Sequence, residues 1–171
     1  SEDTIPPVGS LTLPQGSELD CFRPELRLVG RSGLAAVDYE WLGPRGEVLG
    51  TRREATTATT GLHQLMVTSR RNGCRDTLSF DITEDFTSPT AFIATTEPLT
   101  CLRDSVVLRV RADSPTSPFY RYRWLSPTEE ILGEGPSRTV FSVGTYQLVT
   151  QNIRNGCRDT TSIFVDANQT E

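Results

Sequence analysis

The hexapeptide Asn-Gly-Cys-Arg-Asp-Thr occurs twice in this chain of 171 residues, at 72–77 and again at 155–160, a spacing of 83 residues. Four further pairs share this spacing or a spacing of 80: Tyr39 with Tyr122, Trp41 with Trp124, Leu19 with Leu99 and Cys21 with Cys101. Self-similarity at a long fixed period indicates two copies of one structural unit. The repeat constrains the fold strongly, because both copies must fold in the same way.

The change of spacing from 80 to 83 places three extra residues of the second copy within the segment 112–118. That segment is rich in Ser and Pro, which is typical of a surface loop, and loops tolerate insertions. We place the boundary between the copies near Ser88 and Pro89. The predicted domains are therefore residues 1–88 and residues 89–171.

Apolar and polar residues alternate with a period of two in several short segments. In 120–124 the aromatic side chains share one face and the arginines share the other, and 37–41 alternates in the same way. Short alternating runs separated by Gly, Pro, Asn and Asp are typical of antiparallel strands, and the two Asn-Gly pairs indicate hairpins. The sequence predicts an all-β fold of two tandem immunoglobulin-like antiparallel β-sandwiches.

Aromatic residues at equivalent positions form the predicted core. A Trp on the third strand fills the space between the sheets of an immunoglobulin-like sandwich, and a Tyr after Gly-x can tie the preceding corner through its hydroxyl. In the first copy His63 takes the Tyr position, and we interpret it as a packed, hydrogen-bonded substitute. The predicted core residues are Trp41, Trp124, Tyr39, Tyr122, Tyr146 and His63.

Four motifs in a fixed order suggest a family. They are Leu-x-Cys at 19–21 and 99–101, Tyr-x-Trp-Leu-Gly-Pro-x-Gly at 39–46, Gly-x-Tyr at 144–146 and the two Asn-Gly-Cys segments. This order resembles the immunoglobulin-like or PKD-like repeats of giant Bacteroidota-type cell-surface adhesins, which are often exported by type IX secretion. The resemblance implies an extracellular, cell-surface location and a structural or adhesive role in extending and presenting a binding tip.

Composition narrows the remaining function classes. All 17 basic residues are Arg, there is one His, and the net charge is −5, which argues against Lys chemistry, His-based catalysis and nucleic acid as a partner. No apolar stretch is long enough to insert into a membrane. We find no catalytic constellation, so the chain is predicted not to be an enzyme. A spacer attached to a secreted enzyme is a remote alternative.

Three partner classes follow from the surface charges. The resemblance implies neighbouring repeats of the same long chain, and complementary faces could serve them, since Arg121 and Arg123 in one copy match Asp38 and Glu40 in the other. A glycan- or protein-binding module that uses the loops of one repeat is the alternative function. Arginines near the hairpins could contact sulfated glycan or carboxylate on a surface protein, or could line a solvated loop: Arg70, Arg71, Arg75, Arg154 and Arg158.

The four cysteines, two at equivalent positions in each copy, indicate disulfides formed in an oxidising compartment. Equal placement favours Cys21–Cys74 and Cys101–Cys157, each within its own copy. In an ordinary immunoglobulin-like strand order, however, the two cysteines of one copy fall at opposite ends of the sandwich. The alternative is Cys21–Cys157 across the copies, with Cys74 and Cys101 paired to neighbouring repeats.

Acidic residues gather where the first copy ends. Asp81, Glu84 and Asp85 precede Pro89, and carboxylates at a junction between modules can hold Ca²⁺. The spacing lacks the dense alternation of a strong Ca²⁺ motif, so a solvated acidic linker is the alternative. No other cofactor is expected.

Overall fold

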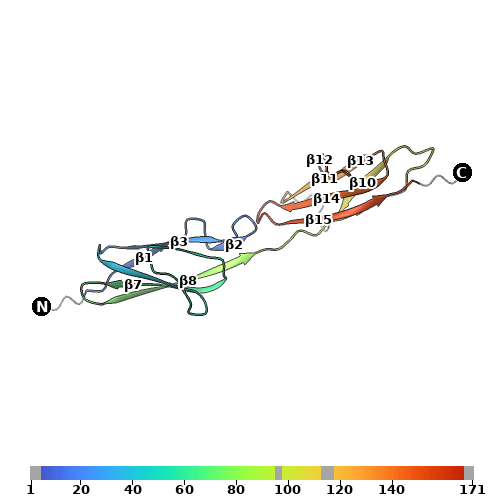
Figure 1. The fold of residues 1–171 in the computed structure, drawn as a ribbon. Helices are drawn as coiled ribbons and strands as arrows, with labels where there is room; N and C mark the ends of the chain where they lie inside the picture. Colours follow the sequence, from blue (N-terminus) through green and yellow to red (C-terminus); the bar gives the residue numbers. More distant parts are fainter. Residues whose placement is uncertain (1–4, 95–97, 113–117, 168–171) are drawn as a thin grey trace. The chain divides into compact units, whose positions relative to one another are not determined.

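The computed structural model describes residues 5–94, 98–112 and 118–167, and it divides the chain into two compact units, Ser1–Phe86 and Thr87–Glu171. Every regular element in the described residues is a β-strand, which confirms the all-β prediction (Figure 1). Most of the predicted insertion loop at 112–118 lies outside the described residues.

Unit 1 (residues 1–86) is a sandwich of two sheets. The smaller sheet has the order β1-β3-β6 and the larger has the order β2-β8-β7-β4-β5. The strands are β1 (Gly9–Thr12), β2 (Glu18–Asp20), β3 (Leu26–Ser32), β4 (Val37–Leu42), β5 (Val48–Gly50), β6 (Glu54–Thr57), β7 (Gly61–Ser69) and β8 (Arg75–Asp85). All neighbours are antiparallel except β2 and β8, which run parallel.

Unit 2 (residues 87–171) repeats this plan. Its smaller sheet has the order β13-β10-β9 and its larger sheet the order β12-β11-β14-β15. The strands are β9 (Phe92–Ala94), β10 (Val106–Arg111), β11 (Tyr120–Leu125), β12 (Ile131–Glu134), β13 (Ser137–Val140), β14 (Gly144–Asn152) and β15 (Arg158–Val165). A parallel bridge between Leu99 and Ala167 takes the place of the β2–β8 pairing.

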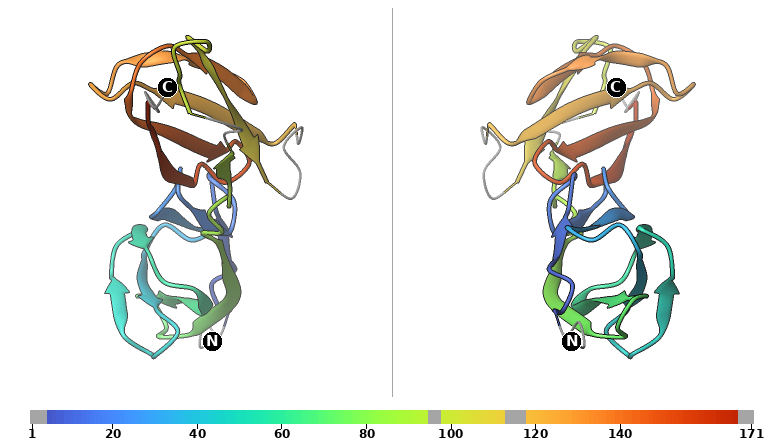
Figure 2. Two further views of the ribbon diagram at one scale, coloured as in Figure 1. Left: turned by 90° about the vertical axis from the view of Figure 1, so that its right-hand side faces the viewer. Right: turned by 90° about the vertical axis from the view of Figure 1, so that its left-hand side faces the viewer.

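The strand order in both units is immunoglobulin-like, with the first strand divided between the two sheets. Within each unit the two sheets face one another (Figure 2). The units share local details as well. An irregularity interrupts the ladder after Trp41 in β4 and after Trp124 in β11, at equivalent positions.

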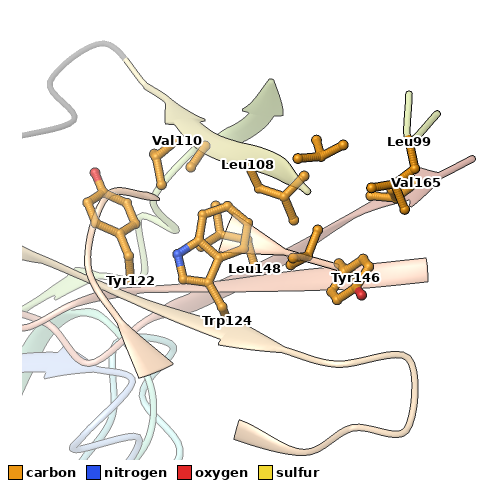
Figure 3. Packing of buried hydrophobic residues seen from close by; sticks show 11 residues of the cluster. Leu99, Leu108, Val110, Tyr122, Trp124, Tyr146, Leu148 and Val165 are labelled. Carbon is orange, nitrogen blue, oxygen red and sulfur yellow. The ribbon is translucent and has the colours of Figure 1, made fainter. Parts of the chain in front are cut away.

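A tryptophan occupies the centre of each core. Trp41 and Trp124 are fully buried, and each indole Nε1–H donates to a backbone carbonyl, that of Arg52 at 3.0 Å and that of Gly135 at 2.9 Å. In unit 2 the Trp124 ring lies among Leu108 and Leu148, with Tyr122 toward one end of the cluster and Tyr146 toward the other (Figure 3). In unit 1 Trp41 packs with Leu28, Leu65 and Val67, and the half-buried Tyr39 lies against this cluster.

The corner before the sixth strand of each sandwich is tied by a buried polar side chain. In unit 2 the Tyr146 hydroxyl donates to the Ser142 carbonyl at 2.9 Å. In unit 1 His63 bonds the Gly61 carbonyl through Nδ1 at 2.8 Å and the Thr57 hydroxyl through Nε2 at 2.9 Å. A carbonyl can only accept, so Nδ1 carries the proton. His63 is fully buried and both its ring nitrogens serve the fold.

A second buried tyrosine hydroxyl has no such bond. In the described part of the chain, no hydrogen-bond partner meets the Tyr122 hydroxyl or the hydroxyl of Thr150, which is its register partner on β14. Burial, and secondarily the charge of Tyr120, raises the pKa of Tyr122 above its ordinary value of 10.0. An unsatisfied buried hydroxyl costs stability, so this pair is a weak point of the core.

The two tyrosines therefore form a matched pair for mutation. We expect Tyr146→Phe to lower the free energy of unfolding by about 1 kcal/mol, because it removes a hydrogen bond. Tyr122→Phe should leave it unchanged or raise it, because no bond is lost. Urea unfolding followed by tryptophan fluorescence measures both, and an equal loss in the two variants would contradict the assignment.

The raised pKa adds a pH signature. Stability held by a group with a raised folded pKa is present below the unfolded pKa and falls as pH rises beyond it. The wild-type chain should therefore lose stability above about pH 10, and Tyr122→Phe should lose less.

Candidate functional site

A four-residue turn presents Cys21 at the end of β2. Backbone bonds close the turn from Asp20 N to Arg23 O (3.0 Å) and from Arg23 N to Asp20 O (3.1 Å). The buried Asp20 carboxylate also accepts the backbone N–H groups of Phe22 and Arg23 and pairs with the Arg23 guanidinium. The Arg23 side-chain hydrogen bond holds the Asp20 pKa below its ordinary value, against the effect of burial.

The equivalent turn in unit 2 presents Cys101. The same two backbone bonds join Thr100 and Arg103, at 2.9 Å and 3.1 Å. The Thr100 hydroxyl accepts the N–H groups of Leu102 and Arg103, as the Asp20 carboxylate does in unit 1. We call the segments 20–23 and 100–103 the exit loops.

The other cysteine of each unit lies in the hairpin before its last strand. The Gly73 N–H donates to Ser69 O and the Gly156 N–H donates to Asn152 O, and both glycines have φ values of +71° and +77° that favour glycine. The Asn72 and Asn155 side chains each accept the backbone N–H of the cysteine two residues later, at 3.0 Å. We call the segments 70–74 and 153–157 the entrance hairpins.

Each entrance hairpin is tied to the chain that enters its own unit. The Asn72 side-chain amide donates to the Ile5 carbonyl at 2.9 Å, ahead of β1. The Asn155 amide donates to the Thr87 carbonyl at 2.9 Å, ahead of β9. The hairpin cysteine therefore lies at the end of the unit where the chain comes in.

Each exit loop lies beside the end of the last strand of its unit. In unit 1 Asp20 pairs with Asp85, the final residue of β8. In unit 2 the Leu99 N–H donates to Asp166 O at 3.0 Å, just beyond β15. The exit-loop cysteine therefore lies where the chain leaves the unit, and the two cysteines of one unit lie at opposite ends.

This register excludes the predicted pairings within units. Cys74 precedes the start of β8 and Cys21 follows the partner of its end, so ten residue steps of roughly 3.3 Å, about 33 Å, separate them. Bridged Cα atoms must come within about 7 Å. The structure has Cys21 and Cys157 disulfide-bonded and a free, exposed thiol at Cys101. Pairing Cys21 with Cys74 and Cys101 with Cys157 is therefore wrong.

The acids predicted to hold Ca²⁺ all belong to β8. Neighbouring strand residues point to opposite faces, so Glu84 projects away from the face shared by Asp81 and Asp85. Among the residues that the structure describes, no group of three His, Cys, Asp or Glu side chains could hold a metal ion. The calcium site stays a prediction with no converging ligands to support it.

Several of the predicted surface charges pair within their own unit. Arg70 bonds Asp38 at 2.5 Å, and Arg123 bonds Glu134 at 3.1 Å. Exposed pairs of this kind contribute less than about 1 kcal/mol. Arg154 of the second entrance hairpin stacks over the Phe119 ring, with its guanidinium carbon 5.0 Å from the ring centre.

The exit end of unit 2 carries exposed apolar groups. Leu102 is 100% exposed, Phe141 is 71% exposed and Val143 is 52% exposed. Cys101 and Phe141 line a shared hollow of about 280 Å³ together with Leu99, Thr100 and Ala167. Phe141 also lines a larger cleft of about 490 Å³ beside Pro127 and Leu132.

Comparisons with known proteins concern the fold alone. No protein-family model and no curated protein matches the chain. The three N-terminal domains of the bacteriophage RB49 highly immunogenic outer capsid protein align over 95% of this chain and 59% of theirs, with 13% identity and a TM-score of 0.46. The chain thus spans less than two thirds of that structure.

Two vertebrate-type immunoglobulin structures align similarly. Murine CEACAM1b aligns over 93% of this chain and 100% of its own, with 16% identity and a TM-score of 0.40. Sidekick-1 immunoglobulin domains 1–5 align over 96% of this chain and 40% of theirs, with 14% identity and a TM-score of 0.40. The described residues include no helix that could cross a membrane.

The exit-loop turns were missed in the sequence analysis. A local signal was present, since Asp and Thr both accept backbone N–H groups two and three residues ahead, and each is followed by Arg at the third position. What the sequence did not indicate is that this turn lies beside the end of the last strand.

The Asp20 carboxylate gives a test of the turn. We expect Asp20→Ala to lower the free energy of unfolding by about 2 kcal/mol, because a buried acceptor of several charged and backbone donors is lost. Asp20→Thr should recover part of that loss, because Thr does the same work at position 100. The Asp20 contribution is present above its unfolded pKa of about 3.8 and is lost as pH falls through the lower folded value.

Unfolding by urea at pH 6 and at acidic pH measures both variants. Thr100→Ala is the matched control in unit 2, where the loss should not depend on acid. A wild-type minus Asp20→Ala difference that is the same at both pH values would contradict this account.

For calcium we expect no effect. A real site would bind only the folded chain and raise the melting temperature by mass action. Because the three acids do not converge, the melting temperature should be equal in millimolar Ca²⁺ and in chelator. A reproducible increase with Ca²⁺, lost in Asp81→Asn, would establish the site.

Proposed function

We propose that the chain is a pair of tandem immunoglobulin-like repeats from a large secreted surface protein, of the Bacteroidota-type adhesin class that its motifs resemble. Its role in this proposal is structural and adhesive: the repeats add length and present a binding tip away from the cell. Extracellular, cell-surface location is part of the proposal, and the disulfide-bonded cysteines support it, because disulfides persist in oxidising compartments.

The observation that carries the proposal is the placement of chain entry and exit within each unit. The chain enters beside the Asn-tethered hairpin and leaves beyond the last strand, at the opposite end. A module whose ends lie at opposite poles adds its long dimension each time it is repeated. A β8 strand of 11 residues corresponds to about 35 Å of length.

The fate of the reactive residue types also supports a non-catalytic role. Both nitrogens of the single histidine are used to hold a buried corner, and the most strongly held carboxylate, Asp20, closes a turn. The alternative function, glycan or protein binding through loops, would use the cleft beside Phe141, and it stays a prediction.

Length per repeat tests the proposal. We expect small-angle X-ray scattering to give the 171-residue chain a maximum dimension of about 70 Å, twice the length of one 11-residue strand. Appending a further copy of residues 89–171 should add about 35 Å more. A maximum dimension that barely grows on adding the third repeat would contradict a role in extension.

A further inference from the structure

We propose that consecutive repeats are joined by disulfides, each from the exit-loop cysteine of one repeat to the entrance-hairpin cysteine of the next. In this chain the bond joins Cys21 to Cys157, and Cys101 is the attachment point for a following repeat. The second part rests on the proposed function, because it requires that further repeats follow.

The polarity of each unit is the first step. The exit-loop cysteine lies beside the end of the last strand, and the hairpin cysteine lies beside the incoming chain. About 33 Å of β-strand separates the two within unit 1, and about 30 Å separates them within unit 2. No repeat can therefore satisfy its own cysteines.

Chain connectivity is the second step. Phe86 ends unit 1 and Thr87 begins unit 2, so the exit of one is covalently continuous with the entrance of the other. The exit cysteine before that junction is Cys21, and the entrance cysteine after it is Cys157. These are the two cysteines that are disulfide-bonded in the structure.

The exit end of unit 2 supplies the third step. Cys101 has the same turn geometry as Cys21, yet its thiol is free and exposed. Beside it lie Leu102, 100% exposed, and Phe141, 71% exposed, which line or flank the hollow at this end. An apolar end with a thiol at its centre fits a second copy of an Asn-Gly-Cys hairpin.

The bond forms by ordinary thiol oxidation. Two thiols lose two protons and two electrons, and one S–S bond forms. A disulfide-containing oxidant, such as an oxidoreductase of the secretory route or oxidised glutathione, accepts the electrons and is released as two thiols.

The first experiment maps the bond in the 171-residue chain. Trypsin is unsuitable, because both hairpin cysteines are released within the identical tetrapeptide Asn-Gly-Cys-Arg. Cleavage before Asp instead places each cysteine in a peptide of its own: 20–37, 38–75, 85–103 and 113–158. The chain is folded with oxidised glutathione, alkylated, digested without reduction and analysed by mass spectrometry.

We expect peptide 20–37 linked to peptide 113–158, and alkylated Cys101 in peptide 85–103. A link from 20–37 to 38–75, or from 85–103 to 113–158, would overturn the proposal. Cys21→Ser should leave Cys157 alkylated, whereas the matched variant Cys101→Ser should keep the expected link. If Cys101→Ser abolished the link, the proposal would likewise fail.

The second experiment adds a further copy of residues 89–171 after residue 171. Peptide 85–103 should now appear linked to peptide 113–158 instead of alkylated, and Cys→Ser at the appended hairpin should restore alkylation of Cys101. Persistent alkylation in the extended chain would overturn the array. Scattering on the same extended chain separates the two ideas, since repeats can add length without any disulfide between them.

Discussion

Each unit depends on the parallel pairing of a short early segment with its last strand. Leu19 pairs with Glu84 in unit 1, and Leu99 bridges to Ala167 in unit 2. The contact buries both leucines and covers the outer edge of the larger sheet, an edge that would otherwise present unpaired backbone groups. It also fixes which end of the unit holds the following cysteine, because a parallel partner carries the chain toward the end of the last strand.

The two units reach one backbone geometry with different chemistry. The exit loop is closed by an ionised Asp20 in one unit and by a neutral Thr100 in the other, with backbone distances that agree within 0.1 Å. The corner is tied by His63 in one unit and by Tyr146 in the other. In each case the side chain satisfies a buried or turn-forming polar group, which would be costly to leave unpaired. The backbone requirement is therefore what the copies share.

Local patterns predicted much of the fold, because antiparallel strands joined by short hairpins are specified by nearby residues. Period-two alternation located β4 and β11, and the Asn-Gly pairs located the last hairpin of each unit. The β2–β8 pairing could not be found in this way. Its partners are 65 residues apart, and Glu18–Asp20 is a strand of three residues with no alternation to reveal it. Without that pairing, equal placement of cysteines favoured bonds that a strand of 11 residues makes impossible.

The same pairing decides how such an array would carry tension. If force enters a repeat at its entrance hairpin and leaves at its exit loop, it acts along the last strand, between points at the two ends of β8. Pulling along a strand loads its ladder bonds to β7 together, since they lie perpendicular to the force. A disulfide at each junction would hand the load from one last strand to the next hairpin and relieve the linker. Two cysteines at opposite ends of every repeat are thus a mechanically coherent arrangement, whereas a bond inside one repeat would leave the junctions held by a single backbone strand.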